Sequence, residues 1–155
     1  MSTRAIGFLK SKGIPFKPVT YDHQKKVAEF AAKAIGFPLE KTIKTLVVDV
    51  GPKGYVFVLM PGNKQLDLKR LSKALGVKRA QMADSHTAEK LTGYLTGGIS
   101  PFGSKRRLPV IMEKSVLDYD TVAINGGQRG TLLIMDPVDI KKVSECKVLE
   151  VAKGI

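Results

Sequence analysis

Two glycine-rich segments and one lysine are the parts of this sequence whose residue types could bind or transform a ligand. The first segment, Leu95–Pro109, cannot form a regular helix across its glycines and prolines, and Pro101 has no N–H to give to an inner strand. It predicts a shaped loop with exposed backbone amides, followed by the basic triplet Lys105, Arg106 and Arg107. Amides and guanidinium groups favour an anionic or ester-like ligand, although a plain connection between two strands could have the same composition.

The second segment, Asn125–Gly130, reads Asn-Gly-Gly-Gln-Arg-Gly and predicts a tight turn. It has neither the glycine spacing nor the following helix of a P-loop or a dinucleotide-binding fingerprint. The lysine is Lys44, at the start of the apolar run Ile43–Val50. There it could point into the mouth of a pocket, as a compact cation for a phosphate or an oxyanion. The alternative is an edge-strand lysine that discourages aggregation.

Standard catalytic and metal-binding patterns are missing from the sequence. Ser100 stands between Ile99 and Pro101, so it cannot be the nucleophile of a Gly-x-Ser-x-Gly elbow. The two histidines and the single cysteine, Cys146, have no metal-ligand spacing. We therefore expect no metal ion and no cofactor, and we expect Cys146 to be a packing residue rather than a nucleophile.

The charge of the chain points to a polyanionic partner. There are 26 lysine and arginine residues against 14 aspartate and glutamate residues, a formal net charge of +12. The basic residues are spread over many segments, so a basic surface would be built by the fold. Nucleic acid is the favoured partner, and a basic exterior that serves only solubility is the alternative.

Length and hydropathy favour one domain spanning residues 1–155, without a membrane segment. The longest apolar run, Tyr55–Met60, is far shorter than the roughly 20 residues that cross a bilayer. The N-terminal apolar stretch Ala5–Leu9 is interrupted by Gly7 and followed by lysines, which is not typical of a signal peptide. A lone cysteine excludes an internal disulfide and agrees with a reducing cytoplasm, where we expect the protein.

The elements that must position these residues are short. Periodicity and capping residues predict helices at Thr3–Lys12, Val27–Ile35, Asp67–Leu75, Asp84–Leu91 and Val138–Val143. Apolar and β-branched runs predict extended segments at Ile14–Phe16, Val19–Tyr21, Ile43–Val50, Tyr55–Met60, Arg79–Met82, Val110–Met112, Thr121–Ile124, Thr131–Met135 and Lys147–Val151. Because hairpins outnumber strand–helix–strand units, we predict an α+β fold with a mixed sheet that curls toward a barrel. A doubly wound parallel sheet is the alternative.

Three segments, in this order, resemble the YbaK family. They are Lys44–Leu46, the loop Gly97–Gly103 with Leu108-Pro109 after it, and Gly126–Gly130. Further matching segments are Thr20–His23, Gln65–Lys69 and Met82–Asp84, so that the resemblance runs from about Ala5 to Val148. The sequence looks closest to the bacterial Cys-tRNA(Pro) deacylase branch, and it is similar to the editing domain inserted in some prolyl-tRNA synthetases.

The resemblance implies a trans-editing enzyme that cleaves the ester between a wrong amino acid and the acceptor end of tRNA(Pro). It implies a mixed, largely antiparallel sheet closed into a barrel-like core with flanking helices, and a partnership with prolyl-tRNA synthetase. In the branch that it resembles, the thiol of the cysteine substrate attacks its own ester carbonyl and forms a cyclic thiolactone. A protein nucleophile is then unnecessary. The alternatives are a deacylase that uses water against alanine or another small amino acid, and a non-catalytic module that binds aminoacyl ends or a synthetase.

The resemblance also implies roles for individual residues. Catalytic roles fall on Lys44, Gly97 and Gly98. Substrate-binding roles fall on Tyr21, Val27, Thr45, Ile99, Ser100, Pro101, Asn125, Gly126 and Gly127. Val27 lies near the place of a family phenylalanine, and Asn125 replaces a family serine, which leaves the amino-acid specificity open. From their charge, we expect contacts with the tRNA backbone from Lys69, Arg70, Lys105, Arg106 and Arg107.

Overall fold

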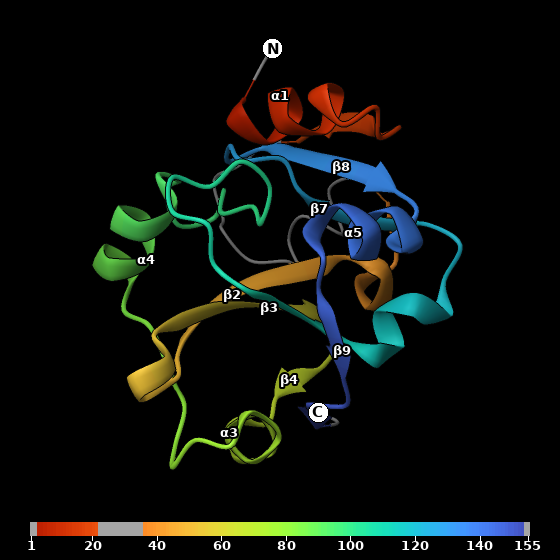
Figure 1. The fold of residues 1–155 in the computed structure, drawn as a ribbon. Coiled ribbons are helices and arrows are strands. Elements are labelled where there is room, and N and C mark those ends of the chain that lie inside the picture. Colours follow the sequence, from red (N-terminus) through yellow and green to blue (C-terminus); the bar gives the residue numbers. More distant parts are fainter. Residues whose placement is uncertain (1–2, 22–35, 154–155) are drawn as a thin grey trace.

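The computed structural model describes residues 3–21 and 36–153. Two sheets and the helices around them form layers, with α1 (Arg4–Ser11) over one sheet and α3 (Leu68–Leu75) under the other (Figure 1). The predicted helix Val27–Ile35, and with it the predicted site residue Val27, lies outside the described residues.

The main sheet has five strands in the order β5-β2-β3-β6-β9. The predicted hairpin is its centre: β2 (Ile43–Asp49) and β3 (Tyr55–Pro61) pair antiparallel across a short 3₁₀ turn, Gly51–Lys53. The other strands are β5 (Gln81–Met82), antiparallel to β2, and β6 (Val110–Glu113) and β9 (Lys147–Leu149), which continue the sheet in parallel.

The second sheet is antiparallel and has the order β1-β8-β7, with β1 (Lys17–Thr20), β7 (Val122–Asn125) and β8 (Thr131–Met135). A two-stranded ribbon joins β4 (Gln65–Leu66) to β10 (Ala152–Lys153). The α+β class with mixed, largely antiparallel pairing is therefore confirmed.

The predicted barrel closure is wrong, because none of the sheets formed by the described residues closes on itself. A single parallel bridge between Thr42 and Ala123 connects the main sheet to the second sheet. The same edge of β2 then pairs with β5 at Val48 and Asp49. A barrel needs an uninterrupted ladder around its circumference, and here one edge of β2 is shared between two partners.

Capping residues bound the helices as the sequence predicts. Side chains of Thr3, Asp67, Asp84 and Asp136 accept N–H bonds in the first turns of α1, α3, α4 (Ser85–Thr92) and α5 (Pro137–Ser144). Helices α3 and α4 end at glycines in the left-handed conformation, Gly76 and Gly93. Two further 3₁₀ turns are Leu39–Lys41 and Lys114–Asp118. In the described part of the chain, no helix is long and apolar enough to cross a membrane.

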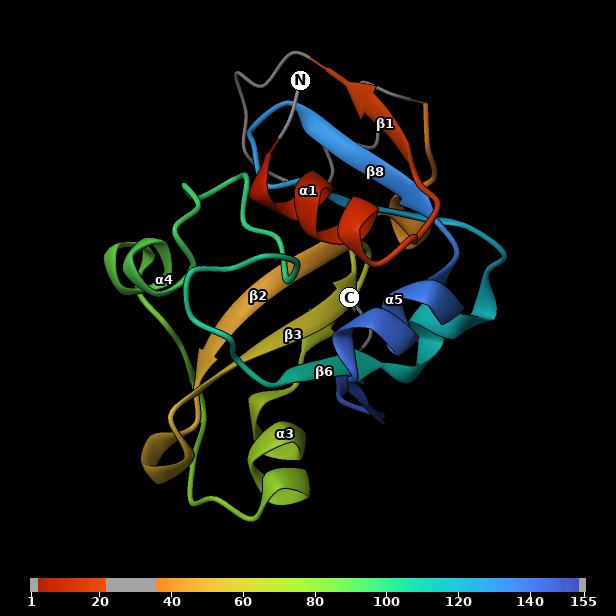
Figure 2. The same cartoon turned by 45° about the horizontal axis from the view of Figure 1, so that its top comes forward.

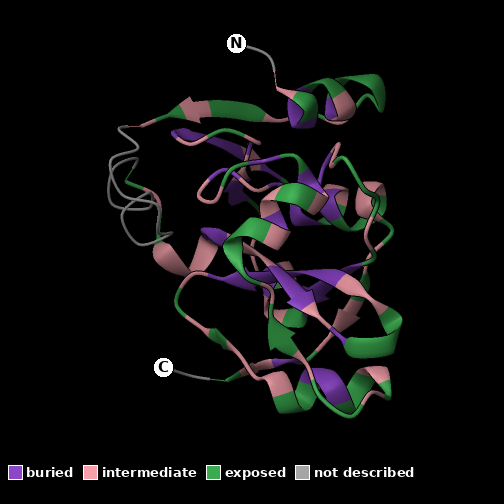
Figure 3. Ribbon diagram, turned by 90° about the vertical axis from the view of Figure 1, so that its left-hand side faces the viewer, coloured by how far each residue is buried: buried purple, intermediate pink, exposed green. Residues whose placement is uncertain are grey.

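The main sheet is buried on both faces. Alternate residues of β2, such as Ile43 and Val47, pack toward α1 and the second sheet, while Val48 packs toward Leu71 of α3. Figure 3 shows this as a band of buried residues through the middle layers. The segment between α4 and β6, which holds the first glycine-rich loop, lies between α1 and the main sheet (Figure 2). The central strands therefore form a rigid support for that loop.

Candidate active site

The structure brings the two glycine-rich segments into direct contact. The side-chain amide of Asn125 donates a hydrogen bond to the Gly97 carbonyl at 2.7 Å. Gly98 packs against the backbone of the second segment so closely that an added Cβ would lie 2.9 Å from the Arg129 nitrogen and 3.0 Å from the Gln128 carbonyl carbon. The missing side chain of Gly98 thus faces protein backbone, and it permits two loops to meet.

Three further glycines of the site occupy positions where a residue with a side chain would be strained or would make too close a contact. Gly97 has φ +91° and Gly127 has φ +89°, a region that residues with a side chain rarely adopt. A Cβ on Gly127 would also lie 2.9 Å from the ring of Tyr94. At Gly126, an added Cβ would lie 3.1 Å from the Thr131 methyl group. These glycines define the path of the backbone before any ligand is considered.

The first loop presents few free amides. The Gly98 N–H already donates to the Leu95 carbonyl at 2.8 Å, whereas the N–H groups of Ile99 and Ser100 have no acceptor among the described residues. The Ser100 side chain is buried, and its hydroxyl accepts the Phe102 N–H at 3.2 Å. Ser100 is therefore a buried, turn-forming residue, whereas Ile99 is partly exposed and its unused N–H lies at the surface side of the loop.

A hydrogen bond from the Tyr94 side chain holds the turn at Pro101. The Tyr94 hydroxyl donates to the Phe102 carbonyl at 2.5 Å, and both residues are buried. Burial raises the pKa of Tyr94 to about 12 and outweighs the opposing effect of the Arg4 charge. The phenol therefore remains a neutral donor at physiological pH, which keeps the end of the loop in place.

Lys44 and Thr45 lie on opposite faces of β2. The Lys44 ammonium donates to the Lys64 carbonyl at 2.5 Å, and burial lowers the pKa of Lys44. Thr45 shares its face with the core residues Ile43 and Val47. Its hydroxyl is buried and has no hydrogen-bond partner within the described residues.

The bridge between Thr42 and Ala123 shows how Lys44 is oriented relative to Asn125, the first residue of the second glycine-rich segment. The two strands run parallel at this bridge, and Lys44 and Asn125 each stand two residues beyond it. Since side chains alternate along a strand, Lys44 and Asn125 point to the same face as the bridged pair. Tyr21 belongs to this face as well, because it packs with Ala123, and its N–H donates to the Gly130 carbonyl at 2.9 Å.

Strand alternation thus places Lys44 and Asn125 on the same face of the β2–β7 junction as Tyr21, and of these three residues Asn125 contacts Gly97. Burial raises the pKa of the Tyr21 phenol, partly opposed by a backbone hydrogen bond from Gly130. Among the described residues, the Lys44 ammonium bonds to the Lys64 carbonyl and to neither glycine segment. Lys44 and Asn125 therefore provide a cation and a side-chain amide on this face, groups suited to holding a phosphate or an ester oxygen.

A protein nucleophile or metal centre is not part of this arrangement. Cys146 packs at the edge of the core near α5, and burial raises the pKa of its thiol. No cluster of three His, Cys, Asp or Glu side chains that could hold a metal ion occurs within residues 3–21 and 36–153.

The basic residues predicted to contact RNA lie in two separate places. Lys69 and Arg70 are exposed on α3, where Arg70 also bonds to the Ala152 carbonyl at 3.2 Å. Lys105, Arg106 and Arg107 are exposed in the segment before β6, where Arg107 forms an ion pair with Glu145. The backbone N–H groups of Lys105 and Arg106 donate to carbonyls at the end of α4 at 2.8 and 2.9 Å, which holds these two residues in place.

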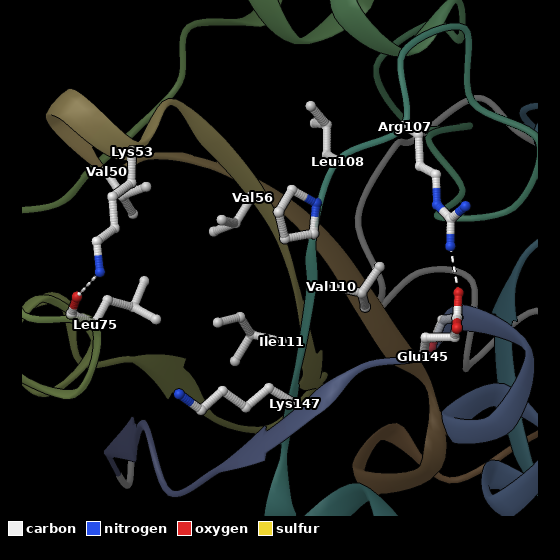
Figure 4. Close-up of a pocket in the computed structure, with 12 residues that line it drawn as sticks. Val50, Lys53, Val56, Leu75, Arg107, Leu108, Val110, Ile111, Glu145 and Lys147 are labelled. Atoms are coloured by element: carbon white, nitrogen blue, oxygen red, sulfur yellow. Dashed lines mark hydrogen bonds and ion pairs between the residues drawn. The ribbon is translucent and has the colours of Figure 1, made fainter.

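Two hollows adjoin at Arg107. Figure 4 shows the first, of about 460 Å³, in which valine, leucine and isoleucine side chains form the floor and Lys53, Arg107 and Lys147 stand at the rim. The second, of about 440 Å³, lies between α1 and the loop Pro101–Ser104. Of the predicted site residues, Arg107 lines both hollows and Pro101 lines the second. Neither hollow is lined by Lys44 or Gly97.

Two residues around the loop were missed by sequence reasoning. The Arg129 side chain donates from Nε to the Thr96 carbonyl at 2.7 Å, and Glu89 of α4 accepts the Thr96 N–H at 2.8 Å. Arg129 could have been found, since it lies within the glycine-rich segment that the sequence singles out. Glu89 gives no such signal, because it looks like any polar residue of an amphipathic helix.

Comparisons with known proteins agree with this description. Residues 22–143 match the model of the aminoacyl-tRNA editing domain. A protein of Enterococcus faecalis named as a Cys-tRNA(Pro)/Cys-tRNA(Cys) deacylase, EbsC, is 31% identical, with 96% of this chain and 92% of that protein covered. The chain therefore belongs to the aminoacyl-tRNA editing domain family, and the resemblance to that family is confirmed.

Other relatives differ in the substrate that their names give. A protein of Escherichia coli K12 named multifunctional Ser/Thr-tRNA deacylase ProXp-y is 27% identical over 92% of this chain and 87% of its own length. A crystal structure described as a trans-editing enzyme for prolyl-tRNA synthetase has a TM-score of 0.89 and 28% identity, and each chain is covered to 99%. The fold and family are thus shared among proteins with different substrate assignments.

Proposed function

We propose that this chain is an aminoacyl-tRNA deacylase that acts in trans and clears Cys-tRNA(Pro). The observation that carries the proposal is the near full-length similarity, at 31% identity, to a relative named as a Cys-tRNA(Pro)/Cys-tRNA(Cys) deacylase. The geometry supports it, because Lys44 and Asn125 share a face at the β2–β7 junction and Asn125 holds Gly97, two residues before the unused N–H of Ile99.

The reaction needs little chemistry from the protein if the substrate supplies the nucleophile. The cysteine sulfur attacks the carbonyl carbon of its own ester, so that a C–S bond forms and the ester C–O bond breaks. The thiol proton ends on the ribose oxygen that leaves, and the products are a thiolactone and free tRNA. The step is intramolecular, and holding the sulfur against the carbonyl carbon in the reactive geometry removes much of the remaining entropic barrier.

In this mechanism, the amide of Ile99 stabilises the negative charge that develops on the carbonyl oxygen. Lys44 holds the terminal ribose-phosphate by its charge, and Tyr21 and Asn125 line the space for the amino-acid side chain. These roles follow from the shared face of the residues and from the donors that the fold leaves unused.

A second candidate substrate is Ser- or Thr-tRNA, because the Escherichia coli relative carries that name and Asn125 offers an amide to a hydroxyl group. Hydrolysis would then require water as the nucleophile. Deacylation of Cys-, Ala-, Ser- and Thr-tRNA(Pro), each with Lys44→Ala as the control, separates the possibilities. Cleavage of the cysteinyl ester alone supports the proposal, and cleavage of the seryl ester at a similar rate contradicts the thiol-assisted step. If no ester is cleaved, a non-catalytic binding module becomes the better description.

We also propose that the acceptor end of tRNA(Pro) and prolyl-tRNA synthetase are the partners. A stretch of 93 residues is 32% identical to part of the proline--tRNA ligase of Trichlorobacter lovleyi, which supports a common substrate. Sedimentation of this chain with synthetase, tRNA(Pro) or both tests the partnership. Binding of tRNA that is unaffected by synthetase would contradict the synthetase part of the proposal.

A further inference from the structure

We infer that Arg129 and Glu89 are positioning residues that clamp Thr96 and thereby set the direction of the unused Ile99 amide in the first glycine-rich loop. The inference rests on the proposed function and names the side chains on which its geometry depends. Neither residue is expected to touch the substrate, so each would act through the backbone of the loop.

The clamp holds both polar groups of the Thr96 backbone. The carbonyl oxygen accepts from Arg129 Nε at 2.7 Å, and the N–H donates to Glu89 Oε2 at 2.8 Å. These partners come from different elements, α4 on one side and the second glycine-rich segment on the other. Hydrogen bonds to ionised groups are stronger than those between neutral groups, so each is a substantial restraint.

The residue that follows Thr96 has little rigidity of its own. Gly97 has φ +91° and no Cβ, so its backbone can rotate at little cost. Its carbonyl is held by the amide of Asn125 at 2.7 Å, and the oxygen of that amide accepts the Gly127 N–H at 3.0 Å. Gly98 completes the contact by packing on the Arg129 backbone. Three consecutive loop residues are therefore held by the segment that contains Arg129.

The clamp lies shortly before the Ile99 N–H, to which the proposed mechanism gives the developing negative charge. Ile99 follows Thr96 by three residues, and a rotation at Gly97 would turn this N–H group. An error of about 1 Å in the position of catalytic groups can lower the rate by about 10²-fold. The effect should fall on kcat, since the exposed cations at Lys105 and Arg106 that would bind RNA are untouched.

The inference also explains why an arginine stands in the second segment of this basic protein. Arg129 is only partly exposed, and its Nε donates to a protein carbonyl, unlike the exposed Arg106. The Arg129 guanidinium group thus joins the two glycine-rich segments. Lysine could donate one hydrogen bond to the Thr96 carbonyl from a longer, more flexible stem, so Arg129→Lys should retain part of the function.

The experiment compares Arg129→Ala and Arg129→Lys with Arg79→Ala, a matched loss of an exposed arginine before β5. On Cys-tRNA(Pro), we expect kcat to fall about 10- to 100-fold for Arg129→Ala and less for Arg129→Lys, with KM and the melting temperature little changed. Glu89→Gln keeps an acceptor oxygen but loses the charge, so its kcat should fall less than that of Glu89→Ala. A wild-type kcat in Arg129→Ala, or a loss that only follows the folded fraction, overturns the clamp.

Amide hydrogen exchange separates the clamp from the proposed function. Exchange at residues 96–100 should be faster in Arg129→Ala than in the wild type and unchanged in Arg79→Ala, whether or not any ester is cleaved. If the wild type cleaves no ester but Arg129→Ala speeds exchange in the loop, the proposed function fails and the clamp stands. If exchange is unchanged, the clamp is overturned even for an active enzyme.

Discussion

At the glycine-rich segments, amide and guanidinium side chains bind backbone carbonyls at 2.7 Å, whereas under α3 the contact is made by the fully buried side chains of Leu71, Val58 and Met60. Directional bonds of the first kind determine where a few backbone groups point. Apolar packing of the second kind is tolerant of direction and contributes stability in proportion to buried area. Changes at the glycine segments should therefore alter activity first, and changes under α3 should alter stability first.

The largest effect is expected from a comparison of two lysines, Lys44 of the proposed site and Lys53 beside α3. Lys44 donates to the Lys64 carbonyl at 2.5 Å, and Lys53 donates to the Leu75 carbonyl at 2.6 Å. Lys44→Ala should lower kcat/KM about 100-fold or more, as is typical when a charge-stabilising donor is lost. Lys53→Ala should leave it unchanged. Steady-state deacylation of Cys-tRNA(Pro) is the measurement. Equal losses of kcat/KM in both variants would contradict the expected difference between the two lysines.

A pair of glycines gives the next largest effect. In Gly98→Ala the new Cβ meets backbone at 2.9 Å, so the two loops must separate, while in Gly76→Ala the strain comes only from φ +69° in open space. Both changes should cost about 1–3 kcal/mol of stability. Only Gly98→Ala should also lower kcat/KM, by about 10-fold or more. Urea unfolding and deacylation of the folded fraction test this, and an active Gly98→Ala protein would contradict it.

Tyr94 connects the stability of the loop to pH. Tyr94→Phe leaves the buried Phe102 carbonyl without its donor and should cost about 1–3 kcal/mol. Because the folded state raises the pKa of Tyr94 from 10.0 to about 12, its contribution is complete below pH 10 and declines as the pH rises from 10 to 12. Melting temperatures across this range should fall more steeply in the wild type than in Tyr94→Phe. If the melting temperatures of the two proteins fall in parallel, ionisation of Tyr94 is not the cause of the wild-type decline.

The smallest effects should appear in RNA binding at the exposed cations. Each lost phosphate contact should reduce the dependence of log K on log salt concentration by about 0.7–0.9. We expect this for Lys105→Ala and Arg106→Ala, and less for Arg107→Ala because Arg107 is already paired with Glu145. Lys69→Ala tests whether RNA also contacts α3. Filter binding at several salt concentrations measures all four slopes, and unchanged slopes would exclude these residues from the RNA interface.

Much of the local structure was predictable from neighbouring residues. Asp67, Asp84 and Asp136 cap helices at the predicted places, and the hairpin of β2 and β3 follows from two apolar runs around Gly51 and Gly54. The family resemblance was confirmed as well. Predicted strand ends were less accurate: Arg79–Met82 forms a strand only at Gln81–Met82, and Lys147–Val151 ends as β9 at Leu149. Strand ends depend on partners that a local pattern does not contain.

The sequence by itself determined that Gly97, Gly98, Gly126 and Gly127 lie in loops and that Lys44 begins a buried strand. These outcomes depend on the conformational freedom of each residue and on the periodicity of its neighbours. Only the tertiary structure decided that Asn125 binds Gly97, that Arg129 and Glu89 hold Thr96, and that β2 is shared between β5 and β7 without closing a barrel. Such contacts join residues as far apart in the chain as Thr42 and Ala123, and they form because the packed sheets bring those residues together.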